Sequence, residues 1–440
     1  MRCKMRFCPN LESLEDRSVP ATLRLVGGNL LISNLAGGTG LLVETTATPG
    51  QLNVTDNGLL VTVSGVGGMV SITGTNLADQ VTFKAEASTY AGNLLINTGN
   101  DNDIVRLQTG ATGGVAGNVT VNTGNANDTI VLQASGPIGI GGNLSVLPGL
   151  GSDTTAVSTA SRVGGSFRVQ DFAGINAFIN VAGLTTGDDL TIAGVTAFVS
   201  SSSLTVGGNL SVASTPGATN LGITFAGATT LGRNLQVISN TGSTGVSLGG
   251  TMVVNGDLGF RLGTNNGLSI AGTVTVNGGM RYVGGQGSDG VVIASGFVLG
   301  GDARFDLAGG SNGVNIAPLA QFAGDLTISG GSGGNALTSL GNIGGDVSIT
   351  LGNGSNGTIL GGNVGGTIRY RGGNGSEALI IAPVVPATVV ADIAFGTGTA
   401  TFSLTSNVTL TGRVRGTGGT YAFVQGGATL SPTLVFENFP

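Results

Sequence analysis

The amino-acid sequence predicts an all-β protein, a parallel β-helix (β-solenoid) of about 15–18 coils, with ~23 residues and three short strands per coil. Three observations lead to this prediction: a repeat of 20 to 25 residues, an apolar–polar alternation inside each copy, and 83 glycines among 440 residues. The repeat is clear where GNLLINTGNDNDIVRL (from Gly92) recurs as GNVTVNTGNANDTIVL (from Gly117). A chain that repeats one short unit many times builds a stack of similar rungs.

The first strand of each coil begins at an apolar anchor residue that usually follows a Gly-Asn or Gly-Asp pair. The anchors are Val70, Leu94, Val119, Leu144, Phe167, Leu190, Leu210, Leu235, Leu258, Met280, Ala303, Leu326, Val347 and Ile368. The residue two positions later is also apolar, whereas the residue between is mostly polar, as at Ser71 and Thr120. This period of two predicts a strand with one buried face.

A second strand follows a Gly-rich turn, with inward pairs such as Val105/Leu107 and Val291/Ile293, and a shorter apolar patch precedes the next Gly pair. One coil cannot bury its own apolar face, so stacking at ~4.8 Å per rung gives a rod of roughly 70–85 Å. Because Tyr282 and Tyr370 lie two residues after an anchor, we expect both rings in the core.

The chain divides into a leader or disordered N-terminus (1–21) and a single β-solenoid domain (22–440). The stretches from Gly28 and from Gln51 are expected to be irregular first coils, and the stretch from Thr409 a late coil. The last residues, ATLSPTLVFENFP, are expected to form a capping strand, because an open solenoid end invites edge-to-edge pairing.

Composition excludes several classes of function. Apolar residues make up 40% and charged residues 9% of the chain, which is unlike a disordered protein. The net charge is −6 and no basic patch with interleaved aromatic residues occurs, so no nucleic-acid partner is expected. No apolar run reaches 18 residues, which argues against a membrane-spanning helix. The two cysteines, Cys3 and Cys8, leave the body without a disulfide framework or a cysteine zinc site.

The sequence predicts no enzyme. It has no histidine, which removes Ser–His, Cys–His and histidine–metal chemistry. A β-helix that cleaves or binds glycans would need paired carboxylates, usually with aromatic platforms, on adjacent coils. Tryptophan is absent and only four tyrosines occur, so this glycan-active or glycan-binding protein is the alternative rather than the leading hypothesis.

Short polar residues recur about nine positions after the anchors. They are Asp79, Asp103, Asp128, Asp153, Asn176, Thr244, Asp289, Asn312, Asn335, Asn356 and Glu377, with Thr196, Asn220 and Asn266 displaced by one to three residues. We expect them in the turn between the first two strands, bonded to local backbone N–H groups or stacked as amide ladders. Four aspartates on successive rungs would repel one another, so a calcium site at Asp101, Asp103, Asp128 and Asp153 is the alternative. No other cofactor is expected.

Two further patterns have simple structural explanations. Arg168, Arg281, Arg304 and Arg369 occupy the outward position of the first strand, where they could bind anions. Pairing with the preceding Gly-Asp column (Asp257, Asp302, Asp325, Asp346) is the favoured explanation. The segment GGQGSDGVV (from Gly284) matches a calcium-binding nonapeptide, but it occurs at most once per coil rather than in tandem, so a turn is expected there.

The segment NLESLEDRSVPATL (from Asn10) resembles the LExLEDRxxPA-type leader of large exported bacterial repeat proteins, and the body resembles β-helix surface proteins. The resemblance implies export to the cell envelope or the extracellular space. The leading functional hypothesis is therefore a non-enzymatic structural or adhesin-like repeat protein that presents an extended polar flank. Its partners would be envelope glycans or other surface proteins, and it could also be one fragment of a larger surface array.

Overall fold

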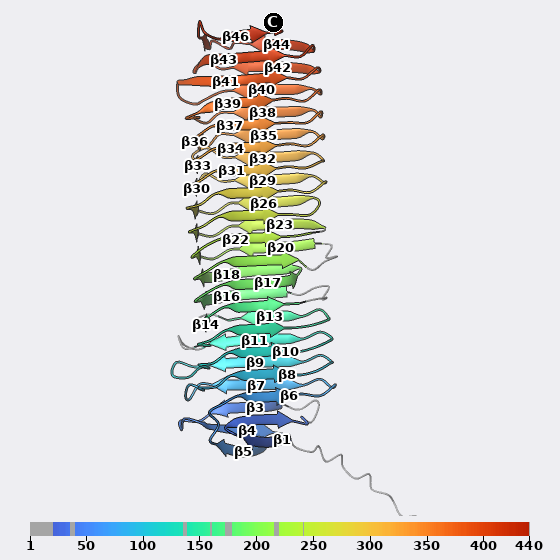
Figure 1. The fold of residues 1–440 in the computed structure, drawn as a ribbon, viewed down its shortest axis with the longest axis vertical. Helices are drawn as coiled ribbons and strands as arrows, with labels where there is room; N and C mark the ends of the chain where they lie inside the picture. Colours follow the sequence, from blue (N-terminus) through green and yellow to red (C-terminus); the bar gives the residue numbers. More distant parts are fainter. Residues whose placement is uncertain are drawn as a thin grey trace, which may run out of the picture.

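The computed structural model of the chain describes residues 21–35, 40–134, 139–158, 161–171, 178–214, 220–240 and 242–439. These residues form an all-β, parallel β-solenoid of about 15 turns with ~23 residues per turn, and they contain no helix. The coils rise from the N-terminal end to the C-terminal end as one straight stack (Figure 1). The predicted fold class is therefore confirmed, with a coil number at the lower end of the expected range. The leader residues 1–20 lie outside the described residues.

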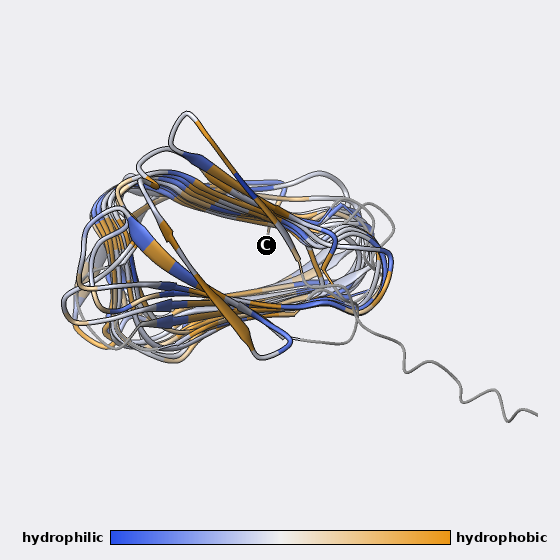
Figure 2. Ribbon diagram, turned by 90° about the horizontal axis from the view of Figure 1, so that it is seen from below, coloured by the Kyte–Doolittle hydropathy of each residue, from blue (hydrophilic) through white to orange (hydrophobic). Residues whose placement is uncertain are grey.

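Seen along the rod, the cross-section is flattened, with two long sides joined by bends (Figure 2). The first long side is a 20-stranded sheet in which nearly all neighbours are parallel. Its strands are β1 (Thr22–Val26), β2 (Asn29–Ser33), β6 (Val70–Thr73), β8 (Leu94–Asn97), β10 (Val119–Asn122), β12 (Leu144–Leu147), β15 (Phe167–Gln170), β17 (Leu190–Val195), β19 (Leu210–Ser214), β22 (Leu235–Ile238), β25 (Leu258–Arg261), β28 (Met280–Val283), β31 (Ala303–Asp306), β34 (Leu326–Ser329), β37 (Val347–Thr350), β39 (Thr367–Arg371), β41 (Ala387–Phe395), β43 (Val408–Gly416), β45 (Thr429–Leu430) and β46 (Val435–Glu437).

The second long side carries one strand from each turn and, at its N-terminal end, two additional antiparallel strands. Its strands are β3 (Gly40–Thr45), β4 (Gln51–Asp56), β5 (Leu59–Ser64), β7 (Gln80–Ala85), β9 (Ile104–Thr109), β11 (Thr129–Ala134), β13 (Thr154–Val157), β16 (Phe178–Thr186), β18 (Ala197–Val206), β20 (Asn220–Phe225), β23 (Ser243–Leu248), β26 (Asn266–Ile270), β29 (Asp289–Ile293), β32 (Asn312–Ile316), β35 (Asn335–Ser339), β38 (Asn356–Leu360), β40 (Glu377–Ile381), β42 (Thr399–Leu404) and β44 (Thr420–Val424).

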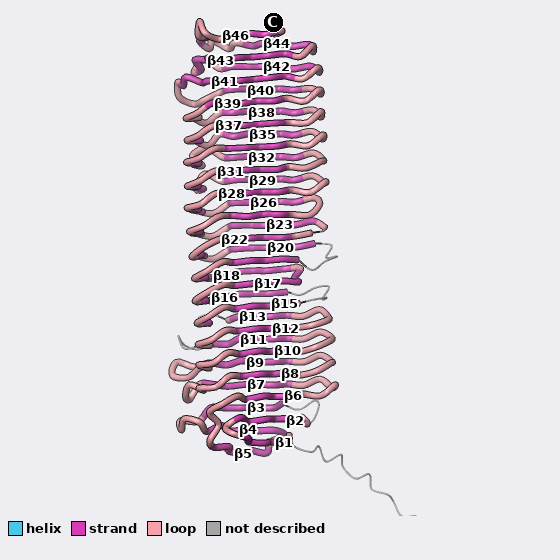
Figure 3. Tube along the Cα trace, viewed as in Figure 1, coloured by secondary structure: helices cyan, strands magenta, loops and turns pink. Residues whose placement is uncertain are grey.

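A short third side closes each coil and varies along the rod (Figure 3). In the middle of the chain it is formed by the ends of β16 and β18 and by separate short strands. The separate strands are β14 (Ser161–Val163), β21 (Thr229–Leu231), β24 (Met252–Val254), β27 (Val274–Val276), β30 (Phe297–Leu299), β33 (Gln321–Phe322) and β36 (Asn342–Ile343). Nearer the N-terminus it shrinks to single bridges, such as Tyr90 with Val115 and Val115 with Ile140.

The predicted register of the first strand is confirmed along the whole array. Each anchor pairs with the next anchor, as Val70 pairs with Leu94 and Leu326 pairs with Val347. The anchors and the residues two positions later are buried, and together with the inward residues of the second and third sides they form one continuous apolar core. Tyr282 and Tyr370 lie fully buried in it, as the sequence predicted.

The N-terminal end differs from the expected irregular coils. The segment from Gln51 is not a coil, because β4 pairs antiparallel with β3 and β5 pairs antiparallel with β4. The β4–β5 loop consists of Asn57 and Gly58, with φ of +50° and +74°. A two-residue Asn-Gly loop of this kind matches the strand twist of a tight hairpin, which explains why the chain folds back here. A similar hairpin joins β1 to β2.

At the C-terminal end, β45 and β46 add parallel to β43, and the predicted capping segment therefore supplies one more rung. Its two phenylalanines lie against rings of the last coils. The ring of Phe439 stacks on Tyr421 with a centroid distance of 5.0 Å and on Phe395 at 5.5 Å. This aromatic cluster covers apolar surface that would otherwise be exposed where the stack ends.

Candidate functional site

The polar column that follows the first strand lies inside the solenoid, not on its surface. We call it the inner ladder. It consists of Asp79, Asp103, Asp128, Asp153, Thr244, Asn266, Asp289, Asn312, Asn335, Asn356 and Glu377, each at most 5% exposed. Asn176 lies outside the described residues. Asn220 is exposed, and Leu221 takes the inward position in its coil, in register with Thr244.

In the N-terminal half, the inner ladder consists of aspartates joined through the backbone. The backbone N–H of Asp79 donates to Oδ1 of Asp103, at 2.8 Å, and that of Asp103 donates to Oδ1 of Asp128, also at 2.8 Å. The N–H of Asp128 donates in the same way to Oδ1 of Asp153, at 2.8 Å. The expected bonds to local turn N–H groups occur at Asp79, which accepts from Thr75. The Oδ1 atoms of Asp103, Asp128 and Asp153 instead accept a backbone N–H of the preceding coil.

Burial shifts the acidity of these aspartates. It raises the pKa of Asp128 to about 7 and that of Asp153 to about 6. Burial is also the largest cause of the raised pKa of Asp79 and of Asp103. The mechanism is desolvation, since an ionised carboxylate loses its hydration inside the core while the neutral acid loses much less.

In the C-terminal half, asparagines take the same column and link it through their side chains. Nδ2 of Asn312 donates to Oδ1 of Asn335 at 3.0 Å, and Nδ2 of Asn335 donates to Oδ1 of Asn356 at 2.7 Å. Each amide nitrogen also lies near carbonyl oxygens of its own turn, as Asn335 does with Gly331 and Gly333. The amide ladder that the sequence suggested therefore exists here, inside the core.

Glu377 ends this asparagine ladder as a buried acceptor that receives several hydrogen bonds. Its Oε1 accepts from Nδ2 of Asn356 at 2.7 Å and from the backbone N–H of Gly373 at 3.0 Å. Its Oε2 accepts the Tyr370 hydroxyl proton at 2.6 Å. Tyr282 precedes Asp289 by the same seven residues and partly offsets the rise that burial causes in the pKa of the Asp289 carboxyl, yet no hydrogen bond of normal geometry joins the two side chains. Aspartate is one methylene shorter than glutamate, which accounts for the difference.

The four residues of the predicted calcium site are not brought together. Asp103, Asp128 and Asp153 are rungs of the inner ladder, whereas Asp101 is exposed in the turn, where its Oδ1 accepts the N–H of Asn102. Among the described residues, no group of three His, Cys, Asp or Glu side chains is placed to hold a metal ion. Calcium binding thus stays a prediction, without a set of ligands to support it. The nonapeptide-like segment contributes Asp289 to the inner ladder instead.

A second ladder explains the Gly-Asn and Gly-Asp pairs before the anchors. In this turn ladder, the side-chain oxygen of each Asn or Asp accepts a backbone N–H of the next coil. Oδ1 of Asn118 accepts from Asn143 at 2.8 Å, and Oδ1 of Asp325 accepts from Asp346 at 2.7 Å. The two ladders run in opposite directions along the rod, because inner-ladder oxygens accept from the preceding coil.

The outward arginines pair with carboxylates, but mostly not with those expected. Arg281 and Arg304 both contact Asp306, which lies on the same face of β31 as Arg304. Only Arg369 pairs with a member of the predicted Gly-Asp column, Asp346. Arg168 has no ion pair within the described part of the chain. Exposed pairs of this kind contribute little to stability.

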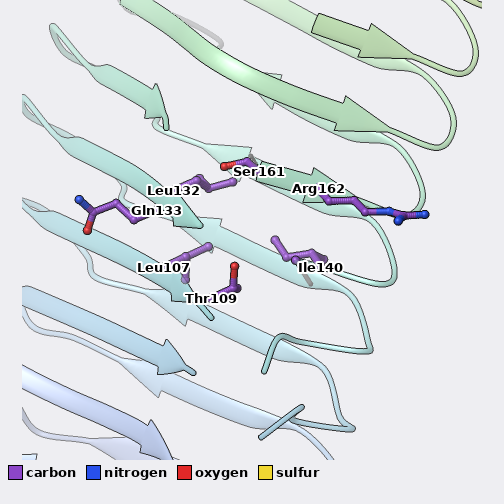
Figure 4. Close-up of a pocket in the computed structure, with 8 residues that line it drawn as sticks. Leu107, Thr109, Leu132, Gln133, Ile140, Ser161 and Arg162 are labelled. Carbon is purple, nitrogen blue, oxygen red and sulfur yellow. The ribbon is translucent and has the colours of Figure 1, made fainter. Parts of the chain in front are cut away.

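Five of the surface hollows on the described part of the chain are lined without any acidic residue. The smallest, of about 20 Å³, lies between β9, β11 and β14 and is lined by Leu107, Leu132 and Ile140 (Figure 4). That is room for about one water molecule. A shallow hollow of about 540 Å³ lies on the second side, over the outward glycines Gly222, Gly245, Gly267 and Gly290.

Comparisons with protein-family profiles, curated proteins and solved structures give no match for this chain. None of the described residues belongs to a helix long and apolar enough to cross a membrane.

Proposed function

We propose that this chain is a non-enzymatic structural or adhesin-like repeat protein, exported to the cell envelope or outside it, where it presents a long polar flank. The observation that carries the proposal is the uninterrupted solenoid itself. About 15 turns continue one core along one axis, and at ~4.8 Å per rung this gives a rod of roughly 70 Å. Such quasi-one-dimensional folds offer extended surfaces rather than a single pocket.

The second side of the rod supports a role in surface contact. One outward position of this side is occupied by glycine in successive coils from Gly222 to Gly357, except for Ala336. These residues pair with one another from coil to coil. A Cβ atom at Gly245, Gly267, Gly313 or Gly357 would meet nothing within 4 Å. Glycine weakens a strand, and the fold does not require glycine at these positions. A row of glycines does, however, make a flat face that a partner can approach closely, and we infer that this is its role. Envelope glycans or other surface proteins would suit this face.

Location is the first test of the proposal. Cells that express the full chain would be fractionated and probed with an antibody, and intact cells would be treated with protease. We expect the chain in the envelope or the medium, with cleavage in intact cells. Recovery of intact, protected chain from the cytoplasm alone would contradict export.

Binding through the second side can be tested separately. We expect Gly267→Arg to fold normally, because its Cβ has free space, and to reduce binding of the purified rod to isolated envelopes. Ser348→Arg on the outward face of β37 is the matched control and should bind as the wild type does. Equal binding by all three proteins would exclude the glycine face as the contact surface.

The alternative is a glycan-active or glycan-binding β-helix. Catalysis on glycans needs two carboxylates in one cleft, and the acids of the inner ladder are sealed in the core. We therefore expect no hydrolase or lyase turnover on common polysaccharides. Turnover that disappears when a single acid is changed would favour the alternative.

A further inference from the structure

The two halves of the inner ladder make the same backbone bond but differ in a second bond. In the asparagine half, Oδ1 of Asn356 accepts from Asn335 twice, from the backbone N–H at 3.2 Å and from Nδ2 at 2.7 Å. In the aspartate half, Oδ1 of Asp128 accepts the backbone N–H of Asp103 at 2.8 Å. From the shared register, the other carboxyl oxygen of Asp103, Oδ2, corresponds to the asparagine Nδ2. An ionised carboxyl has no hydrogen to complete the second bond.

Asp103 and Asp128 each have one candidate donor nearby, the hydroxyls of Thr98 and Thr123, which partly offset the rise that burial causes in the pKa of the two carboxyls. Both side chains are 1% exposed, and Oδ2 of each is buried without a hydrogen-bond partner among the described residues. These hydroxyls, however, lie within hydrogen-bond distance of backbone carbonyls of the next coil, at 3.4 and 3.1 Å, and a hydroxyl has one proton to share between the two acceptors. A buried polar atom in this position costs free energy unless it acquires a bond.

The charged groups that act on the aspartate half are all acidic. Within the ladder, the charge of Asp103 acts on Asp79 and Asp128, and that of Asp153 acts on Asp128. From outside it, Asp56 acts on Asp79, Asp101 on Asp103 and Asp171 on Asp153. No lysine or arginine acts on these four carboxyls in the part of the chain that the structure describes. Ionising several of them together would place like charges on adjacent rungs with no counter-charge.

We propose that Asp103 and Asp128 are carboxylic acids in the folded protein and that each uses its proton to complete the ladder. Oδ2–H of Asp103 donates to Oδ1 of Asp128, and Oδ2–H of Asp128 donates to Oδ1 of Asp153. The protonated aspartate then reproduces the bonds of asparagine with the same backbone register. The coils from Asp79 to Asp153 thereby become a pH-sensitive segment of the rod, because loss of these protons leaves acceptor facing acceptor inside the core.

The direction of the pH effect follows from the raised pKa values of Asp128 and Asp153. The folded pKa of Asp128 is about 7 and that of Asp153 about 6, against 3.8 for an ordinary aspartate. The unfolded chain therefore loses these protons at a lower pH than the folded chain does. The stabilisation is complete below about pH 4 and is lost as the pH rises through about 6 to 7. Asp79 contributes less, since its Oδ2 accepts the Thr75 N–H at 2.7 Å and tolerates charge better.

Thermal melting of the full chain between about pH 4 and pH 8, with a chelator present, tests this assignment. Wild type should melt at progressively lower temperature as the pH rises. Asp128→Asn should weaken that dependence and raise the melting temperature at the alkaline end by a few degrees. The reciprocal variant, Asn335→Asp, should add a pH dependence of the same sign to the other half. Identical pH profiles for wild type, Asp128→Asn and Asn335→Asp would overturn the proposal.

Hydrogen exchange of the wild-type chain provides a test that needs no variant. After correction for the intrinsic pH dependence of exchange, β9, β11 and β13 should lose protection above about pH 7, while β32, β35 and β38 keep theirs. Equal loss in both halves would contradict a local segment. Repeating the melts with millimolar calcium in place of the chelator tests for a cation. A calcium-dependent rise that Asp128→Asn abolishes would assign the ladder to a metal ion instead of protons.

Discussion

The two halves of the inner ladder occupy the same place in successive coils, yet one is built from acids and the other mainly from amides. From Asp79 to Asp153, backbone N–H donors link each ladder residue to the next coil. From Asn312 to Glu377 it is held by side-chain amides and ends at a carboxylate that receives three donors. The strands on both sides stay in register in either case.

This difference separates the requirements of the fold from those of the side chain. The coil needs an acceptor at Oδ1 to satisfy a backbone N–H inside the core, and both residue types supply it. The second atom decides whether the rung is complete at every pH, as with asparagine, or only when a proton is present, as with aspartate. A repeat protein can therefore vary its pH response along the rod without changing its architecture.

The largest expected effect comes from a carboxylate placed in the core away from the inner ladder. Val291 is 1% exposed, and its neighbours in register are Leu268 and Val314. Val291→Asp offers no ladder bond to its charge, so we expect a loss of roughly 3–5 kcal/mol in the free energy of unfolding. Chemical denaturation at neutral pH measures it.

Val292→Asp is the matched control, because Val292 is 49% exposed. Its effect should stay within about 0.5 kcal/mol. If Val291→Asp is as mild as this control, then buried acids are tolerated anywhere in the core and the ladder has no special role.

A smaller effect is expected where the asparagine ladder ends. Tyr370→Phe removes the hydroxyl that donates to Oε2 of Glu377 at 2.6 Å. The carboxylate then lacks one donor, which should cost about 1–3 kcal/mol and cost more as the pH rises. Urea unfolding at two pH values measures both. Tyr282→Phe should cost less, since no hydrogen bond of normal geometry joins its hydroxyl to Asp289. Equal losses for the two variants would mean that the bond to Glu377 does not stabilise the ladder.

The smallest effect is expected at the aspartate outside the ladder. Asp101 is exposed and has φ of +118°, a conformation that asparagine also tolerates. Its charge raises the pKa of Asp103, so Asp101→Asn should lower that pKa slightly and change stability by less than about 0.5 kcal/mol. Melting with and without calcium checks this. If calcium raises the melting temperature of wild type but not of Asp101→Asn, then Asp101 takes part in a calcium site, as the sequence predicted.

The sequence was sufficient for the architecture because each rung repeats the same alternation. The anchors from Val70 to Ile368 pair in the predicted register, and the inward tyrosines lie in the core. The antiparallel β4–β5 hairpin was missed, although Asn57–Gly58 between two apolar stretches is a strong hairpin signal. The segment from Gln51 also has the apolar–polar alternation of a coil, and the prediction followed that alternation instead of the Asn-Gly pair.

The candidate site was only partly predictable. The polar column was found, but it was expected in a turn, whereas Asp103 lies two residues before the inward Val105 and shares its side of the strand. Applying the period of two to this residue would have placed it inside. The partner of Arg304 is Asp306, two residues later on the same face, and the same rule would have found it. The bonds between coils, by contrast, depend on the stacking of distant segments, and no local pattern reveals them.

The most direct measurement is the infrared spectrum of the folded chain with isotope-labelled aspartate carboxyls, recorded at about pH 6. That pH lies below the pKa of about 7 of Asp128 and well above the ordinary value of 3.8. Protonated carboxyls in the inner ladder predict a carbonyl stretching band of a carboxylic acid that becomes much weaker in an Asp103→Asn/Asp128→Asn double variant, in which Asp153, with a pKa of about 6, retains part of the band. A wild-type spectrum that contains carboxylate bands alone would contradict the account.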